Sequence, residues 1–161
     1  MIMQYGLSLI LEDTRRNSSL LIGCSGWNYP DTPEEGGGWT GVFYPDKETK
    51  RLRYYSQFFE TAEMDSTFYN RYYSKMTKGT FIGMTKATRE KFQFSIKVPE
   101  TITHEKRLDI DKGAMADFEE FTDKISPIKS ANKLGAILIQ LPPSFTGVVF
   151  VQQRQYFGLE Q

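Results

Sequence analysis

From residue 20 onward, short apolar runs alternate with segments whose apolar residues recur every three or four positions. Residues 20–25 and 134–141 are continuous apolar runs closed by glycine or proline, which is typical of buried parallel strands. Residues 61–67 are predicted to form another strand. Residues 92–98 alternate strictly, which places Phe92, Phe94, Ile96 and Val98 on one face and Gln93, Ser95 and Lys97 on the other.

Three helices are predicted between these strands. The first contains apolar residues at helical spacing, the second spans residues 75–88, and the third carries an apolar stripe from Met115 to Ile128 that we expect to stop near Pro127. Such alternation predicts parallel strands joined by right-handed crossovers, in a doubly wound sheet or a barrel. The first strand–helix turn lacks the glycine patterns that cradle phosphate groups, so the sequence gives no reason to choose a dinucleotide-binding fold.

Composition and charge narrow the classes of partner. The chain has 161 residues, of which 39% are hydrophobic, and its 20 Lys plus Arg balance its 20 Asp plus Glu. An overall basic charge that would attract nucleic acid or an anionic membrane is therefore absent. Cys24 is the single cysteine, which fits a reducing cytosol, and no stretch is typical of a signal peptide or a membrane span. We predict a cytoplasmic protein with a small-molecule ligand and no membrane partner.

Five segments together resemble the YecE-like family, domain of unknown function 72. They are IGCSGWNYPD (22–31), FYP (43–45), EMDSTFY (63–69), FQFSIKVP followed by ITH (92–104) and LGAILIQLPPSF (134–145). The resemblance implies a TIM-type (β/α) barrel whose biochemical activity is not established. It therefore strengthens the fold prediction and leaves the reaction open. Asp65 stands where the family commonly has asparagine.

Length and tail point to an incomplete barrel. A complete TIM barrel typically needs about 250 residues, and the tail TGVVFVQQRQYFGLEQ does not continue the family pattern. We predict an α/β fold that is an incomplete TIM-type barrel of about four βα units. Its expected parts are an extension at residues 1–19, a half barrel at 20–145, and a divergent tail at 146–161 that marks a truncation. Unpaired strand edges in such a half barrel predict self-association.

Candidate catalytic residues lie where the strands of a (β/α) barrel end, because the working face of that fold is there. They are Glu63, Asp65, Lys97 and His104. Neighbouring carboxylates raise one another's pKa and an ammonium lowers it, which gives groups with different proton affinities. We expect Glu63, Asp65, Lys97 and Gln140 to share one cavity. An ion pair between Lys97 and Glu63 that only fills the barrel interior is an equally weighted alternative.

The candidate ligand-binding residues are polar or aromatic and lie near the same face. They are Ser25, Trp27, Tyr29, Thr67, Phe68, Tyr69 and Gln140. We favour aromatic pocket walls over core packing, and place stacking on single-stranded nucleic acid third. Glu63, Asp65 and His104 are suitable metal ligands, but their spacing is not diagnostic, so no metal is predicted and the cofactor is unknown. The basic residues from Lys47 to Arg53 are interpreted as the solvated face of the first helix.

Two functions stay open at this point. The first is a barrel enzyme that transforms a small polar substrate, with this chain inactive because the second half of the barrel is missing. The second is a non-catalytic module that binds a nucleotide, a sugar or a nucleic-acid fragment with the same face.

Overall fold

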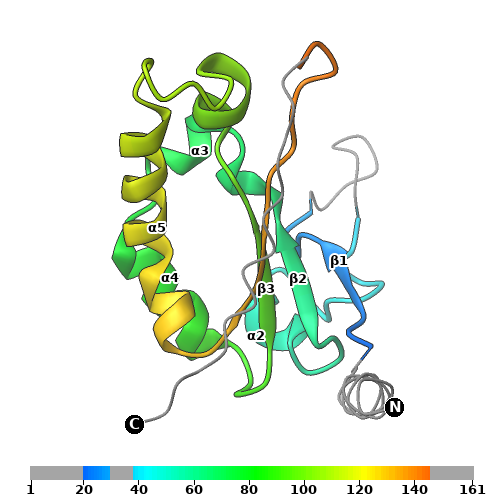
Figure 1. The fold of residues 1–161 in the computed structure, drawn as a ribbon. Helices are drawn as coiled ribbons and strands as arrows, with labels where there is room; N and C mark the ends of the chain where they lie inside the picture. Colours follow the sequence, from blue (N-terminus) through cyan, green and yellow to red (C-terminus); the bar gives the residue numbers. More distant parts are fainter. Residues whose placement is uncertain (1–19, 30–37, 146–161) are drawn as a thin grey trace, which may run out of the picture.

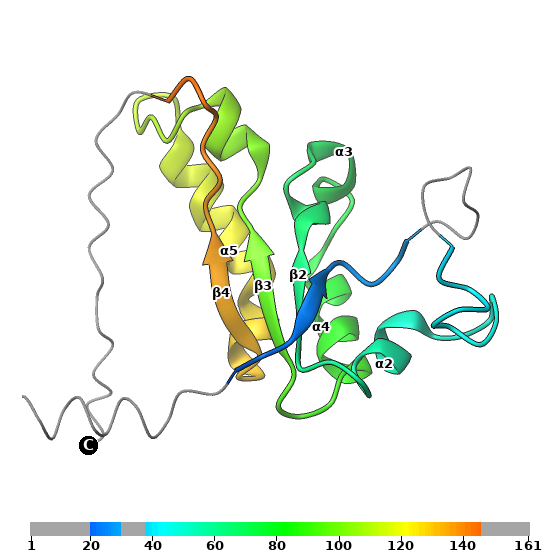
Figure 2. The ribbon, with the colours of Figure 1, turned by 90° about the vertical axis from the view of Figure 1, so that its right-hand side faces the viewer.

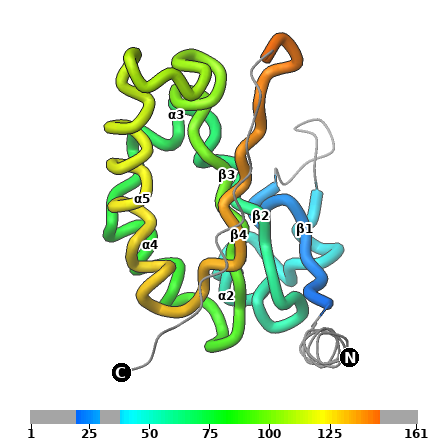
Figure 3. Tube along the Cα trace, viewed as in Figure 1, coloured from blue at the N-terminus to red at the C-terminus, as the bar shows by residue number. Residues whose placement is uncertain are grey.

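The computed structural model describes residues 20–29 and 38–145, so the predicted extension and tail lie outside the described residues. Four parallel strands form one sheet, in the order in which they occur along the chain (Figures 1, 2 and 3). They are β1 (Gly23–Ser25), β2 (Thr61–Met64), β3 (Gln93–Lys97) and β4 (Leu134–Leu138). A doubly wound sheet reverses its strand order at a switch point, and these strands do not. The α/β prediction is confirmed, and the described strands form an open sheet without closing a barrel.

The connections between the strands contain helices of very different length. They are α2 (Arg51–Tyr55), the 3-10 turn η2 (Asp65–Thr67), α3 (Asn70–Tyr73), α4 (Lys78–Ala87), the π-helical turn η3 (Thr101–Glu105) and α5 (Ala114–Ser130). Thr77 and Thr80 form a capping box at the start of α4, which satisfies two backbone N–H groups there. None of the helices in the described ranges has the length and apolar character needed to cross a membrane.

The hydrophobic core lies between the sheet and the two longer helices, α4 and α5 (Figures 1 and 2). Parallel pairing places Phe94 beside Ala62 and Ile96 beside Met64, so the apolar residues of neighbouring strands form continuous rows. The predicted apolar face of β3 is confirmed, because Phe92, Phe94, Ile96 and Val98 are all buried. The side chains that pack on this face from the helices are mainly Phe81, Phe121, Ile125 and Ile128.

The other face of the sheet has a different composition. Ser25 pairs with Glu63, Glu63 with Ser95, and Ser95 with Ala136, so these four residues form one row across all the strands. Ser25 and Ala136 are exposed, and the two between them are half-buried. The outer edges of β1 and β4 pair with no strand among the described residues. Self-association through these edges stays a prediction.

Several predicted elements are longer than the observed ones, and two boundaries are wrong for a clear physical reason. The second strand ends at Met64, because the chain then turns into η2, where the Thr67 hydroxyl donates to the Met64 carbonyl at 2.8 Å. Asp65 therefore lies in the turn instead of on the strand. The third helix continues through Pro127 to Ser130. Burial of Ile125 and Ile128 on either side of the proline supports this last turn, although proline lacks the N–H that a helix interior uses.

A buried lysine closes the end of α4 that is opposite the strand carboxyl ends. Lys133 is only 5% exposed, and its Nζ lies 2.9 Å from the Thr85 and Thr88 carbonyl oxygens and 2.7 Å from that of Arg89. The last carbonyls of a helix have no partner within the helix, so the ammonium satisfies them. Burial lowers the pKa of Lys133.

Candidate functional site

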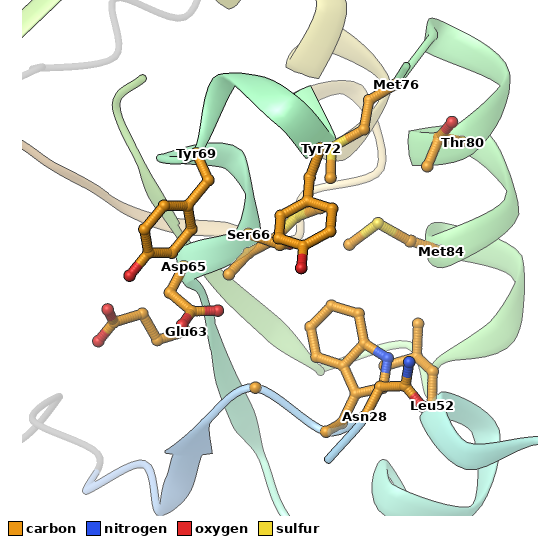
Figure 4. Close-up of a pocket in the computed structure, with 13 residues that line it drawn as sticks. Asn28, Leu52, Glu63, Asp65, Ser66, Tyr69, Tyr72, Met76, Thr80 and Met84 are labelled. Atoms are coloured by element: carbon orange, nitrogen blue, oxygen red, sulfur yellow. The ribbon is translucent and has the colours of Figure 1, made fainter. Parts of the chain in front are cut away.

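A cavity of about 550 Å³ lies at the carboxyl-terminal ends of β1 and β2, between these strands and the helices α3 and α4 (Figure 4). Its lining comes from five parts of the chain: Gly26, Trp27 and Asn28 after β1, Leu52 of α2, Glu63 and Met64 of β2, Asp65, Ser66, Tyr69 and Tyr72 from η2 to α3, and Met76, Thr80 and Met84 at α4. This is the end of the sheet at which parallel α/β folds bind ligands.

Glu63 and Asp65 form one end of the cavity. Figure 4 shows both carboxylates on the same side, with the Tyr69 hydroxyl pointing toward them. The Gly26 N–H donates to the Glu63 carbonyl at 2.9 Å, which fixes the turn after β1 against β2. Gly26 has a φ of +92°, a conformation that L side chains rarely adopt, and a Cβ there would lie 4.0 Å from Asp65 Oδ1. The positive φ therefore favours glycine at this turn, and a Cβ would make only an ordinary van der Waals contact with Asp65.

The opposite end of the cavity is apolar. Met76, Met84 and Leu52 line it, and Figure 4 places the two methionines on the side away from the carboxylates. Met84 is 7% exposed and belongs to the core, so this wall is continuous with the packed interior. Trp27 also lines the cavity, and its ring meets Phe94 edge-on at a centroid distance of 6.0 Å.

Arg51 organises the loop that carries Trp27 to this position. Its guanidinium donates to Asn28 Oδ1 at 2.9 Å and to the Tyr29 carbonyl at 2.6 Å, and lies 5.4 Å from the centroid of the Tyr44 ring. The Tyr44 hydroxyl donates to the Trp27 carbonyl. The interpretation of this basic stretch as a solvated helix face is therefore wrong for Arg51, because its fork of N–H donors matches the backbone and amide oxygens of the loop.

Tyr29 and Ser25 lie beside the acidic end without lining the cavity. The Tyr29 hydroxyl donates to the Ser25 carbonyl, and its ring packs on Trp39 at 4.7 Å. Burial raises the pKa of Tyr29, and the negative charge that Cys24, Asp65 and Glu63 can carry raises it further. The phenol therefore stays protonated at neutral pH and remains a hydrogen-bond donor next to the two acids.

Lys97 and His104 form a separate group around Phe68. The Lys97 ammonium lies 4.8 Å from the centroid of the Phe68 ring, and the His104 ring meets Phe68 edge-on at 5.0 Å. His104 Nδ1 lies 2.9 Å from the Thr103 hydroxyl. Lys97 makes no ion pair with Glu63 or Asp65, all three of which the structure describes. The four residues predicted to form one acid/base group therefore lie in two places: Glu63 and Asp65 line the cavity, whereas Lys97 and His104 contact Phe68.

Thr67 and Gln140 also lie away from the cavity. Thr67 is fully buried, and its hydroxyl lies 2.8 Å from the Met64 carbonyl and 2.6 Å from the Lys97 carbonyl, so it connects the ends of β2 and β3. Gln140 follows β4 and is exposed. The expectation that Lys97 and Gln140 share a cavity with the two acids fails, because neither of them is among the residues that line it.

Metal ligands do not come together in the described ranges, where no group of three or more His, Cys, Asp or Glu side chains is arranged to hold an ion. His104 belongs to the Phe68 group, so it does not join Glu63 and Asp65 at the cavity.

Sequence reasoning missed the apolar wall. Thr80 and Met84 are four residues apart, a spacing that places both on one face of α4, and Met76 lies just before the cap of the same helix. The spacing can be read from the sequence. However, Gly79 and Gly83 lie within the same segment and disfavour a helix, so the sequence did not indicate that Thr80 and Met84 share a helix face.

Comparisons with known proteins agree on one family. The model described as "Protein of unknown function DUF72" matches residues 21–156. The UPF0759 protein YunF of Bacillus subtilis (strain 168) is 30% identical over 129 residues, which are 78% of this chain and 41% of that protein. The crystal structure of a DUF72 family protein from Thermotoga maritima MSB8 superposes with a TM-score of 0.61 at 28% identity, over 81% of this chain and 47% of that one.

The chain thus spans less than half the length of these two relatives. The strands described here run parallel and in chain order, as consecutive strands of a TIM barrel do. On the match of the family model over most of its length, the chain belongs to the DUF72 family.

Proposed function

We propose that this chain binds a small polar molecule in the cavity at the ends of β1 and β2, with the carboxylates of Glu63 and Asp65 accepting hydrogen bonds from hydroxyl or amino groups of the ligand. The observation that carries the proposal is the cavity itself. Its volume of about 550 Å³ falls in the range of ligand sites, and two carboxylates converge on an otherwise largely apolar lining.

The make-up of the lining disfavours anionic ligands. No lysine, arginine or histidine is among the described residues that line the cavity, whereas Glu63 and Asp65 are. A phosphate group would meet two negative charges there and no positive one, which costs binding free energy. The alternative function as a nucleotide or nucleic-acid module therefore gains no support from this cavity, and binding of an uncharged sugar remains compatible with it.

Catalysis by the same site needs a proton donor and acceptor close to the bound ligand. Glu63 and Asp65 satisfy the requirement of position, and Lys97 and His104 do not, because they surround Phe68 outside the cavity. Conversion of the ligand by a longer relative is thus expected to depend on the two carboxylates alone.

The test is a binding screen of small polyols, sugars and amines against the full chain, read by tryptophan fluorescence and calorimetry. Trp27 lines the cavity and reports its occupancy. We expect Glu63→Gln and Asp65→Asn each to weaken binding at least about tenfold. Glu48→Gln, which removes an exposed acid that does not line the cavity, serves as the control and should change nothing.

Absence of any ligand, or ligands whose affinity the two cavity variants leave unchanged, would overturn the proposal. Mass spectrometry of the same mixtures, with a longer family member in parallel, detects products. If both proteins bind the ligand and neither forms a product, the function is non-catalytic binding and the enzyme hypothesis is wrong.

A further inference from the structure

The cavity has two chemically distinct ends, and both restrict what can fill it. Figure 4 shows Glu63 and Asp65 on one side and Met76 and Met84 on the other, with Tyr72 between them. A molecule that is polar throughout would satisfy only the acidic end. It would also place polar groups against thioether and aliphatic side chains, where they find no hydrogen-bond partners.

Charge at the acidic end restricts the ligand further. A bound ligand removes water from the two carboxylates, and desolvated carboxylates need a compensating positive charge or several donated hydrogen bonds. Arg71 stacks on the rings of Tyr69 and Tyr72, at 5.7 and 4.6 Å from their centroids, yet it is not a lining residue. The described lining thus supplies no cation of its own, and a ligand that carries one is favoured.

The apolar end is suited to a flat or aliphatic group. Methionine side chains are flexible and polarisable, and they adapt to aromatic and aliphatic partners. Trp27 adds an aromatic surface to the lining, and Leu52 contributes an aliphatic side chain from α2. The tyrosine rings at positions 69 and 72 are 41% and 46% exposed, so their surfaces remain accessible beside the cavity.

We infer that the ligand class of this site is an organic cation with an apolar arm, of the arylalkylamine or alkylamine type, in which the ammonium contacts Glu63 and Asp65 and the arm packs against Trp27, Met76 and Met84. This inference rests on the proposed binding function and names its ligand class. The volume of about 550 Å³ accommodates such a molecule without rearrangement of the core.

Three probes separate charge from shape in fluorescence and calorimetric titrations of the full chain at neutral pH. They are phenylethylammonium, the neutral phenylethanol with the same arm, and ethylammonium with the same charge and almost no arm. We expect phenylethylammonium to bind at least about tenfold more tightly than either of the others. Asp65→Asn should reduce that advantage over phenylethanol, because it removes one of the two negative charges.

A pair of variants tests the arm. Met76→Gln introduces a polar amide into the apolar end and should weaken phenylethylammonium binding at least about fivefold, whereas Met76→Leu keeps the end apolar and should leave binding nearly unchanged. Met76 is only partly buried, so both variants are expected to fold, and thermal melting of each one checks this.

Each alternative result has a definite meaning. Equal binding of phenylethanol overturns the requirement for charge, and equal binding of ethylammonium overturns the apolar arm. If a sugar or polyol binds in a manner that depends on Glu63 while phenylethylammonium does not bind, the inferred class is wrong and the proposed function stands. If none of the polar molecules or the three probes binds, both are wrong.

Discussion

The two faces of the sheet differ in composition and burial, although the same strands form both. On one face, Ala62, Phe94 and Ile96 are fully buried against the helices. On the other face, the row that includes Glu63 and Ser95 is polar and only half-buried. Neighbouring residues on a strand point to opposite faces, so a single step along β2 or β3 moves from the packed layer to the polar one.

This difference shows where stability and binding are located. The packed face contains most of the buried apolar surface, which provides the main stabilising free energy of folding. The polar face buries little apolar surface, but near the carboxyl-terminal end of β2 it supplies the Glu63 carboxylate of the cavity. Substitutions on the first face should therefore change stability, and those on the second should change it much less.

The largest expected effect comes from a pair of neighbouring residues on β3. Phe94→Ala should lower the free energy of unfolding by about 3–5 kcal/mol, because it leaves a cavity at the centre of the core. Ser95→Ala, one residue further, should change it by less than about 0.5 kcal/mol. Urea denaturation followed by circular dichroism measures both. Similar losses for the two variants would show that the faces are not energetically distinct.

Alkaline pH provides a second way to weaken the packed face. Burial raises the pKa of Tyr44 to about 12, and it also raises the pKa values of Tyr55 and Tyr73 above the ordinary value. The unfolded chain loses its phenol protons near pH 10 while the folded chain keeps them, so stability is retained below that pH and falls as the pH rises further. Each tyrosine should contribute a slope of about 1.4 kcal/mol per pH unit.

Tyr73→Phe sharpens this prediction. The Tyr73 hydroxyl is buried and has no hydrogen-bond partner among the described residues, so its removal should leave stability at neutral pH unchanged or slightly higher. The alkaline loss should become less steep, because one fewer buried phenol titrates. Denaturation midpoints at several pH values, together with absorbance of the phenolate, measure both effects. An unchanged slope would show that Tyr73 does not contribute.

Lys133 is the polar exception on the packed side, and its effect should be smaller. Lys133→Met would remove the ammonium from the carbonyl groups at the end of α4, which we expect to cost about 2 kcal/mol even though the Phe92 N–H still donates to the Arg89 carbonyl. The exposed Lys129 on α5 provides the matched control, and Lys129→Met should cost less than about 0.5 kcal/mol. Equal melting temperatures of the two variants would contradict the capping role.

Much of the packed face could be predicted from the sequence because periodicity reports burial directly. The alternation of residues 92–98 identified the core residues of β3, and residues 20–25, 61–67 and 134–141 were predicted to form the other three strands. Local contacts that override periodicity could not be predicted. The turn at Asp65 depends on hydrogen bonds of Thr67 to two strands, and the passage of α5 through Pro127 depends on the burial of Ile128.

Less of the site could be predicted, because it combines residues that are distant in the chain. The rule that function lies at the strand ends identified Glu63, Asp65, Trp27 and Tyr69 as candidates, and all four line the cavity. The rule cannot tell which strand ends converge, so Lys97, His104 and Gln140 were grouped with them. It also says nothing about side chains that helices contribute, such as Met84.

The smallest expected effect concerns Lys97, whose role distinguishes the two original interpretations of the polar face. A buried ion pair with Glu63 would make Lys97→Met costly, about 3–5 kcal/mol, because the carboxylate would be left without its partner. Within residues 20–29 and 38–145 the ammonium lies over the Phe68 ring and makes no ion pair, and such a cation–π contact contributes about 0.5–1 kcal/mol at a partly exposed position. We therefore expect Lys97→Met to lower the free energy of unfolding by less than about 1 kcal/mol. Urea denaturation measures this free energy for Lys97→Met and for the control Lys97→Arg, which keeps a cation over the ring. A decrease of several kcal/mol for Lys97→Met would support the ion-pair interpretation instead.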